Sequence, residues 1–186
     1  RRWHAEALYW AAECSYALKR YAEARERYSR YLQRYKRGAK RRQTHYGLGW
    51  AVFKLGEYTE AERLFGRYAN VYTPRPQAVV AYYYAGMSAL AAEGEGGSLK
   101  HFARFLRLAP RHKLAPEARR QIVGLALSRG RYDLLELTLS QCGGAQGATW
   151  RDGARSLADH HFGERRYRGA RRWWLRSLQR EVDPTR

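Results

Sequence analysis

The chain repeats itself with a period of about 37 residues, and this internal repeat constrains the fold more than any other sequence feature. The segment RYAEA at residues 20–24 recurs 37 residues later as EYTEA at residues 57–61. Two periods further on, Tyr132 follows the same kind of turn, and a fifth copy at Tyr167 arrives two residues early. A helix pair that cannot cover its own apolar face must stack on copies of itself, so the repeat predicts a solenoid.

Composition favours helices in every unit. Hydrophobic residues make up 45% of the 186 residues, which is enough for a buried core, and there are only 5 prolines. The run from Ala78 to Ala92 is shorter than the roughly 20 apolar residues of a membrane-spanning helix, so we expect none. The sequence predicts one all-α domain of about five helix pairs, with units at residues 5–41, 42–78, 79–115, 116–150 and 151–186.

Small and large residues recur at fixed places within the units. Gly49 and Gly86 are expected to be small because the two helices of a pair cross closely there, and Ala12 and Ala158 occupy the equivalent places. Small residues of the second helix, at Ala24, Ala61 and Ala170, complete the crossing. The aromatic residue four positions after each such place is expected to fill the space between neighbouring pairs. These aromatic residues are Tyr28, Phe65, Phe102 and Trp174.

Boundary signals agree with this register. Pro110 is expected to end a helix and Pro116 to start the next one. Thr149, with an acidic residue three positions later, is similar to a capping box. The glycine-rich segments 94–98 and 143–147 are expected to be loops. The third unit has Glu95 where the other units have tyrosine.

The repeated pattern is aromatic-aromatic-small-small, followed by Gly/Lys-x-Tyr-x-x-Ala-x-x-x-aromatic, and it resembles the tetratricopeptide repeat family over nearly the whole chain. The ALYWAA segment at 7–12, the YGLG segment at 46–49 and the period near 37 are similar to the bacterial cell-envelope members. Those members include the Tol-Pal coordinating protein and the outer-membrane assembly lipoprotein. The resemblance implies a right-handed α-solenoid whose first helices line a concave groove for a protein partner. It also implies a periplasmic or envelope-associated location, with the cytoplasm as the alternative.

The repeat register also predicts where a partner would bind. It places three tyrosines at equivalent positions of the first helices, with further apolar residues one and two turns later. In the last two units arginines take the place of the tyrosines. The groove is therefore expected to change from aromatic to cationic, which suits a segment with apolar anchors at one end and acidic residues at the other. The predicted partner-binding residues are Tyr9, Tyr46, Trp50, Phe53, Tyr83, Met87, Arg120 and Arg155.

A net charge of +19 supports a second hypothesis, a basic module that binds nucleic acid, an anionic envelope polymer or a membrane surface. Its arginines also suit a solvated helix surface, so the charge alone does not choose between the two. In the second basic cluster Trp173 accompanies the arginines, whereas the repeat already needs Trp174 as a packing residue. The two clusters are Arg34, Lys36, Arg37, Lys40, Arg41 and Arg42, and then Arg165, Arg166, Arg168, Arg171, Arg172, Arg176 and Arg180.

Catalytic chemistry is not indicated. The sequence has no nucleophile elbow, HExxH motif, dinucleotide fingerprint or phosphate-binding loop. The adjacent His160 and His161 are expected to point to different helix faces, so no metal site is predicted, and Cys14 and Cys142 are expected to be packed thiols. We predict a non-catalytic scaffold without a cofactor. A domain separated from a larger enzyme or secretion component remains open, as do the partner and the oligomeric state.

Overall fold

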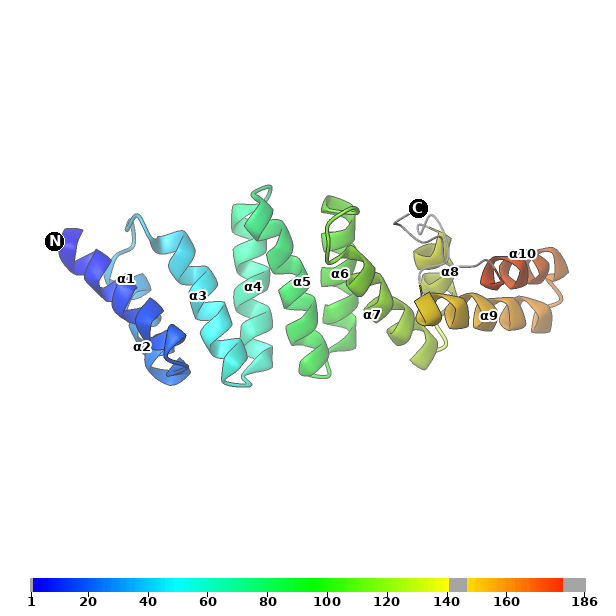
Figure 1. The fold of residues 1–186 in the computed structure, drawn as a ribbon, viewed down its shortest axis with the longest axis horizontal. Helices are drawn as coiled ribbons and strands as arrows, with labels where there is room; N and C mark the ends of the chain where they lie inside the picture. The colour runs from blue at the N-terminus through cyan, green and yellow to red at the C-terminus, as the bar shows by residue number, and fades with distance from the viewer. Residues whose placement is uncertain (1, 141–146, 179–186) are drawn as a thin grey trace. The chain divides into compact units, whose positions relative to one another are not determined.

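The protein is all-helical, as seen in a computed structural model that describes residues 2–140 and 147–178 (Figure 1). Within these residues there are ten α-helices and no strand. They form five pairs, and a turn of three residues joins the two helices of each pair. The pairs are α1 (Arg2–Ala17) with α2 (Tyr21–Arg34), α3 (Arg41–Lys54) with α4 (Tyr58–Tyr72), α5 (Pro76–Ala91) with α6 (Glu95–Leu108), α7 (Ala115–Ser128) with α8 (Tyr132–Ser140), and α9 (Gly147–Gly163) with α10 (Tyr167–Ser177).

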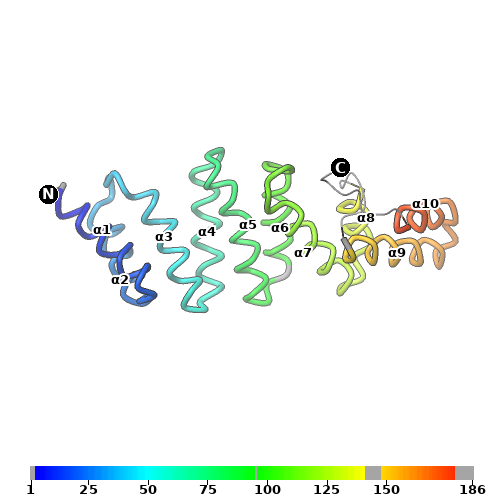
Figure 2. The backbone as a smooth tube through the Cα atoms, viewed as in Figure 1, coloured from blue at the N-terminus to red at the C-terminus, as the bar shows by residue number. Residues whose placement is uncertain are grey.

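The helices gather into two compact units. The first unit spans residues 1–109 and holds the first three pairs, and the second spans residues 110–186 and holds the last two. In the first unit each helix packs against the next one along the chain, which the backbone tube of Figure 2 lets the reader follow. A single domain along the whole chain stays a prediction. In the described part of the chain, no helix has the length and apolar character needed to cross a bilayer.

The same turn closes all five pairs. Each turn contains one residue in the left-handed conformation, and these residues recur with the repeat, at Lys19, Gly56, Glu93, Gly130 and Arg165. The backbone amide of the residue after the left-handed one donates a hydrogen bond to the carbonyl oxygen five residues before it. In the first pair this bond runs from the Arg20 amide to the Ser15 carbonyl, at 2.9 Å. This is a Schellman motif, and it satisfies carbonyls that the helix end leaves free. The repeated tyrosines then start the second helices, which confirms the register of the repeat.

The helix crossings confirm the need for small residues. A Cβ atom added to Gly49 would lie 3.0 Å from the Phe65 ring, and one added to Gly86 would lie 2.7 Å from the Phe102 ring. Both rings are fully buried. The aromatic residue of the second helix therefore packs directly against the small residue of the first. Ala12 is fully buried at the equivalent place in the first pair.

The second unit has its own hydrophobic core, and this core corrects one prediction. Trp173 is fully buried among residues of α7, α8 and α9, whereas Trp174 is 36% exposed. Trp173, and not Trp174, therefore takes the packing position, so Trp173 is not available to a ligand. Residues three and four positions after Ala170 lie on the same helix face, so spacing alone did not separate the two rings.

Three local predictions were wrong. Residues 95–98 form the first turn of α6 and not a loop. Glycine at position 97 serves packing there, since a Cβ would come 2.6 Å from Glu62 Oε1. Thr149 lies inside α9, which begins at Gly147, so it does not cap that helix. Cys14 is exposed and not packed. The predicted loop at 143–147 falls largely, and Cys142 falls entirely, outside the described residues. The helix boundaries at Pro110 and Pro116 are confirmed.

The crossing in the third pair can be tested with two matched substitutions. We expect Gly86→Leu to lower the free energy of unfolding by about 1–3 kcal/mol, because the new side chain overlaps a buried ring that has no room to move. Gly96→Leu, where an added Cβ meets nothing within 4 Å, should leave stability unchanged or raise it by up to about 1 kcal/mol. Urea denaturation followed by circular dichroism measures both. Equal stability of the two variants would contradict the close crossing.

The two neighbouring tryptophans of α10 give a second test. Trp173→Ala should destabilise the second unit by about 3–5 kcal/mol, because it empties a large part of the core. Trp174→Ala should cost about 1 kcal/mol or less, since that ring is partly exposed already. Thermal unfolding of both variants measures the difference. A larger loss for Trp174→Ala would show that the packing position had been assigned to the wrong residue.

Candidate partner-binding site

The predicted aromatic groove is in large part helix packing. Tyr9 and Tyr83 are each only 7% exposed, so little of either ring could reach a partner. Tyr46 is half-buried, and its ring centroid lies 5.2 Å from that of Tyr68. Trp50 packs across two pairs, with its ring centroid 4.5 Å from that of Tyr84 on α5. The equivalent tyrosines therefore hold neighbouring helices together.

Some apolar surface of the first helices remains accessible. Trp50, Phe53 and Met87 are half-buried, so each still presents part of its side chain to solvent. Trp10 on α1 is 54% exposed and was not predicted as a partner residue. Its ring lies beneath the Lys40 ammonium group, 5.4 Å from the Nζ atom, in a cation–π contact. We call Trp10, Trp50, Phe53 and Met87 the first-helix surface.

The two predicted cationic groove residues lie in the second unit. Arg120 on α7 and Arg155 on α9 are both exposed, and Arg120 forms an ion pair with Glu117 at 2.8 Å. The first-helix surface belongs to the first unit. A groove that runs from aromatic to cationic along the chain therefore stays a prediction.

The basic clusters are only partly free for a ligand. Lys40 covers the Tyr9 and Trp10 rings, and Arg41 donates a hydrogen bond to the Leu32 carbonyl at 2.9 Å. In the second cluster, Arg166 and Arg172 form ion pairs with Glu164 and Glu136. Arg42 is half-buried. Arg176 is also half-buried and lies over the Trp173 ring, 4.9 Å from its centroid. The other predicted residues that the structure describes are exposed, namely Arg34, Lys36, Arg37, Arg165, Arg168 and Arg171, while Arg180 lies outside the described residues.

The adjacent histidines of α9 point to different surroundings, as predicted. The His160 ring stacks on Tyr132 with centroids 3.9 Å apart, whereas His161 is buried and lies 3.5 Å from Glu136. Across residues 2–140 and 147–178, no three His, Cys, Asp or Glu side chains gather closely enough to hold a metal ion.

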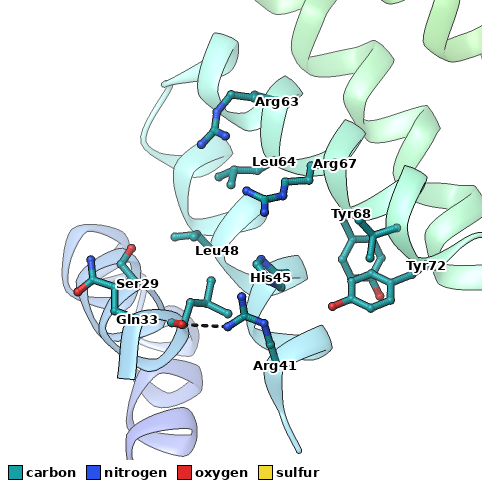
Figure 3. A pocket seen from close by; sticks show the side chains of 12 residues that line it. Ser29, Gln33, Arg41, His45, Leu48, Arg63, Leu64, Arg67, Tyr68 and Tyr72 are labelled. Atoms are coloured by element: carbon teal, nitrogen blue, oxygen red, sulfur yellow. Dashed lines mark hydrogen bonds between the residues drawn. The ribbon is translucent and has the colours of Figure 1, made fainter. Parts of the chain in front are cut away.

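A pocket of about 530 Å³ lies between α2, α3 and α4 of the first unit (Figure 3). This volume is in the range of small-ligand sites. On α3 its residues stand at positions 41, 45 and 48, each five positions before 46, 50 and 53. Five residues rotate a helix by about 140° beyond a full turn, so the pocket and the first-helix surface use different faces of α3. It is lined by Ser29, Leu32, Gln33, Arg41, His45, Leu48, Arg63, Leu64, Arg67, Tyr68, Val71 and Tyr72.

The pocket is cationic. Three of its lining residues are arginines and none is acidic. Figure 3 shows the guanidinium groups of Arg41 and Arg67 on either side of the His45 ring. Burial, together with the positive charge of these two arginines, lowers the pKa of His45 to about 4. The ring is therefore neutral at neutral pH and can both donate and accept a hydrogen bond.

The arginines of the pocket differ in their partners. Arg63 donates two hydrogen bonds to the Glu60 carboxylate, at 2.6 Å and 2.5 Å. Arg41 is held by the Leu32 carbonyl. Arg67 is exposed and, among the residues that the structure describes, forms neither an ion pair nor a side-chain hydrogen bond. Arg67 is thus the arginine best able to meet an incoming anion.

Sequence reasoning missed this pocket because it followed only the first helices. Neither His45 nor Arg67 belongs to a site that the sequence predicts. One signal was present in the repeat: Arg30, Arg67 and Arg104 are 37 residues apart on three second helices. Even so, the repeat could not show that Arg67 faces a hollow, because the neighbouring side chains decide that.

The low pKa of His45 makes stability depend on pH. Between about pH 6.5 and pH 4 the unfolded chain binds a proton at this ring that the folded chain does not, so folding is weakened as the pH falls. We expect wild-type stability to fall more steeply over this range than that of His45→Gln, which cannot titrate. Urea denaturation midpoints at a series of pH values measure the difference. Parallel curves for the two proteins would contradict the assignment.

Comparisons with known proteins agree with this architecture. Residues 2–125 match the YfiO family, described as an outer membrane lipoprotein family. No curated protein sequence matches significantly. Among solved structures, the MamA protein superposes with a TM-score of 0.61 at 15% identity, covering 94% of this chain and 90% of that chain. PilF of Pseudomonas aeruginosa superposes with a TM-score of 0.59 at 19% identity, covering 92% of this chain and 73% of that chain.

A third solved structure, the tetratricopeptide-like repeats of a kinesin light chain protein from Podospora anserina, gives a TM-score of 0.55 at 11% identity, covering 92% of each chain. At these identities the structures show the fold alone. The family match spans more than half of the sequence and includes residues 2–109 of the first unit. The chain therefore belongs to the YfiO family of outer membrane lipoproteins and is a tetratricopeptide-type repeat protein.

Proposed function

We propose that this chain is a protein-binding scaffold of the bacterial cell envelope, which holds a segment of a partner protein on the first-helix surface of its first unit. The observation that carries the proposal is the accessible aromatic area on α1 and α3. Trp10 is 54% exposed, and Trp50 and Phe53 present part of their rings to solvent. Tryptophan and other aromatic side chains are typical anchors of protein interfaces, because they bury a large area with few rotatable bonds.

The fold and the family support the same role. Repeats of this kind form extended surfaces suited to binding, and the tetratricopeptide fold generally serves interaction and not catalysis. The family description places related proteins at the outer membrane, which favours an envelope location for this chain. Binding of nucleic acid or of an anionic polymer stays a prediction, which a salt titration of DNA or RNA binding would test.

The choice of variant matters for a test of this surface. Trp50 contacts the rings of Phe65 and Tyr84 inside the unit, so Trp50→Ala would weaken the fold together with any binding. Trp10 and Phe53 lie nearer the edge of the aromatic packing. Phe53 contacts Trp50 and Tyr58 at centroid distances of 5.7 Å and 5.3 Å, so another aromatic residue at position 53 can keep these contacts.

We expect a photoreactive phenylalanine analogue at position 10 or 53 to crosslink to one specific envelope protein in intact cells of the source organism. The same analogue in place of Arg107, an exposed residue of α6, is the control and should give no such product. Gel electrophoresis and mass spectrometry identify the products, and cell fractionation reports the location. Absence of a specific product at both test positions would contradict the proposed surface.

A further inference from the structure

We propose that the pocket between α2, α3 and α4 binds a carboxylate side chain of an acidic polypeptide segment, with Arg67 as the main anion-binding residue. This inference deepens the proposed function, on which it rests, because it names the chemistry of the partner. The pocket lies on a different face of α3 from the first-helix surface, so it would provide a second point of attachment. Of its lining residues, the sequence pattern singles out only Arg41, as a member of the first basic cluster.

The pocket carries positive charge that its own lining does not neutralise. Arg41, Arg63 and Arg67 line the pocket, and its lining has no acidic residue. The Glu60 carboxylate beside it is already held by Arg63, through both guanidinium hydrogen bonds. The positive charges of Arg41 and Arg67 therefore stay uncompensated within the lining, and an arginine with free donors binds a carboxylate through two parallel hydrogen bonds.

A neutral histidine stands beside the arginines of the pocket. His45 lies between the Arg41 and Arg67 guanidinium groups, as Figure 3 shows. Burial lowers the pKa of this ring, and the positive charges of the two arginines lower it further, so the imidazole stays uncharged at neutral pH. An uncharged imidazole can donate one hydrogen bond to a carboxylate oxygen without a charge of its own. Arg67 and His45 can thus act on the same anion from α4 and α3.

The walls of the pocket favour a polypeptide over a bare anion. Four aliphatic side chains, Leu32, Leu48, Leu64 and Val71, line it together with two tyrosine rings. Val71 is 62% exposed, so the apolar wall reaches the surface. A segment in which acidic and apolar residues alternate would place carboxylates on the arginines and aliphatic groups on this wall. Inorganic phosphate would leave the apolar wall uncovered.

Arg67 is a suitable residue to change. It is exposed and has no intramolecular partner among the described residues, so Arg67→Gln should fold normally. Arg41 is less suitable, because it holds the Leu32 carbonyl. Arg107 is exposed on α6 of the same unit and outside the pocket, so Arg107→Gln removes one positive charge without touching the site. This control matters for a chain with a net charge of +19.

The probe is a fluorescent pentapeptide, Leu-Glu-Leu-Glu-Leu, acetylated and amidated so that it has no terminal carboxylate. The uncharged control peptide has the same sequence with glutamine in place of both glutamates. Anisotropy at about 0.15 M salt should show the glutamate peptide binding at least about tenfold more tightly than the glutamine peptide. Arg67→Gln should weaken the glutamate peptide about tenfold or more, and Arg107→Gln less than about twofold.

Nuclear magnetic resonance of the His45 ring locates the binding. The glutamate peptide should shift its signals and raise its pKa, because a carboxylate would partly cancel the two arginine charges. Equal binding of the two peptides, no binding, or an equal effect of both variants would overturn the inference. So would tighter binding of inorganic phosphate, which would make this a small-anion site. Persisting crosslinks from position 53 in Arg67→Gln cells would then show that the proposed function survives.

Discussion

The close crossing of paired helices, formed around glycine in the second and third pairs, is the constraint on which the rest of this structure depends. A phenyl ring of the second helix lies against a glycine of the first, as Phe102 does against Gly86 and Phe65 against Gly49. This contact sets the distance between the helices of a pair. The Schellman turn fixes the length of their connection at three residues. Because the turn recurs in all five pairs and the ring-on-glycine contact in two of them, the pairs are built on one plan.

Most of the aromatic side chains are packed between neighbouring helices. Tyrosines that the repeat places in equivalent positions, such as Tyr9 and Tyr83, are nearly buried, because they fill the space between one helix and the next. Polar contacts accompany this packing. The Tyr28 hydroxyl donates a hydrogen bond to Glu13 at 2.7 Å, and burial together with this carboxylate raises the pKa of Tyr28. What remains for a partner is the area that stacking leaves uncovered, at Trp10 and along the edges of Trp50 and Phe53.

An arginine that recurs at one position of the repeat has different neighbours in each unit. Arg30, Arg67 and Arg104 occupy the same place in three second helices. Arg30 forms an ion pair with Glu26 on its own helix, and Arg104 lies over the Tyr82 ring. Arg67 has no such neighbour among the described residues and borders the pocket beside His45. The repeat thus supplies an arginine at this place in each of the first three units, and the surroundings decide which one is free to bind.

The sequence by itself determined the helix class, the register of the repeat, the starts of the second helices and the small residues at the crossings. These follow from spacing, because helical periodicity and steric limits act locally and leave a pattern in the chain. Only the tertiary structure decided that Trp173 and not Trp174 enters the core, that the predicted groove tyrosines are packed, and that a cationic pocket lies between three helices. Burial and electrostatic environment depend on residues far apart in the chain, and no local pattern records them.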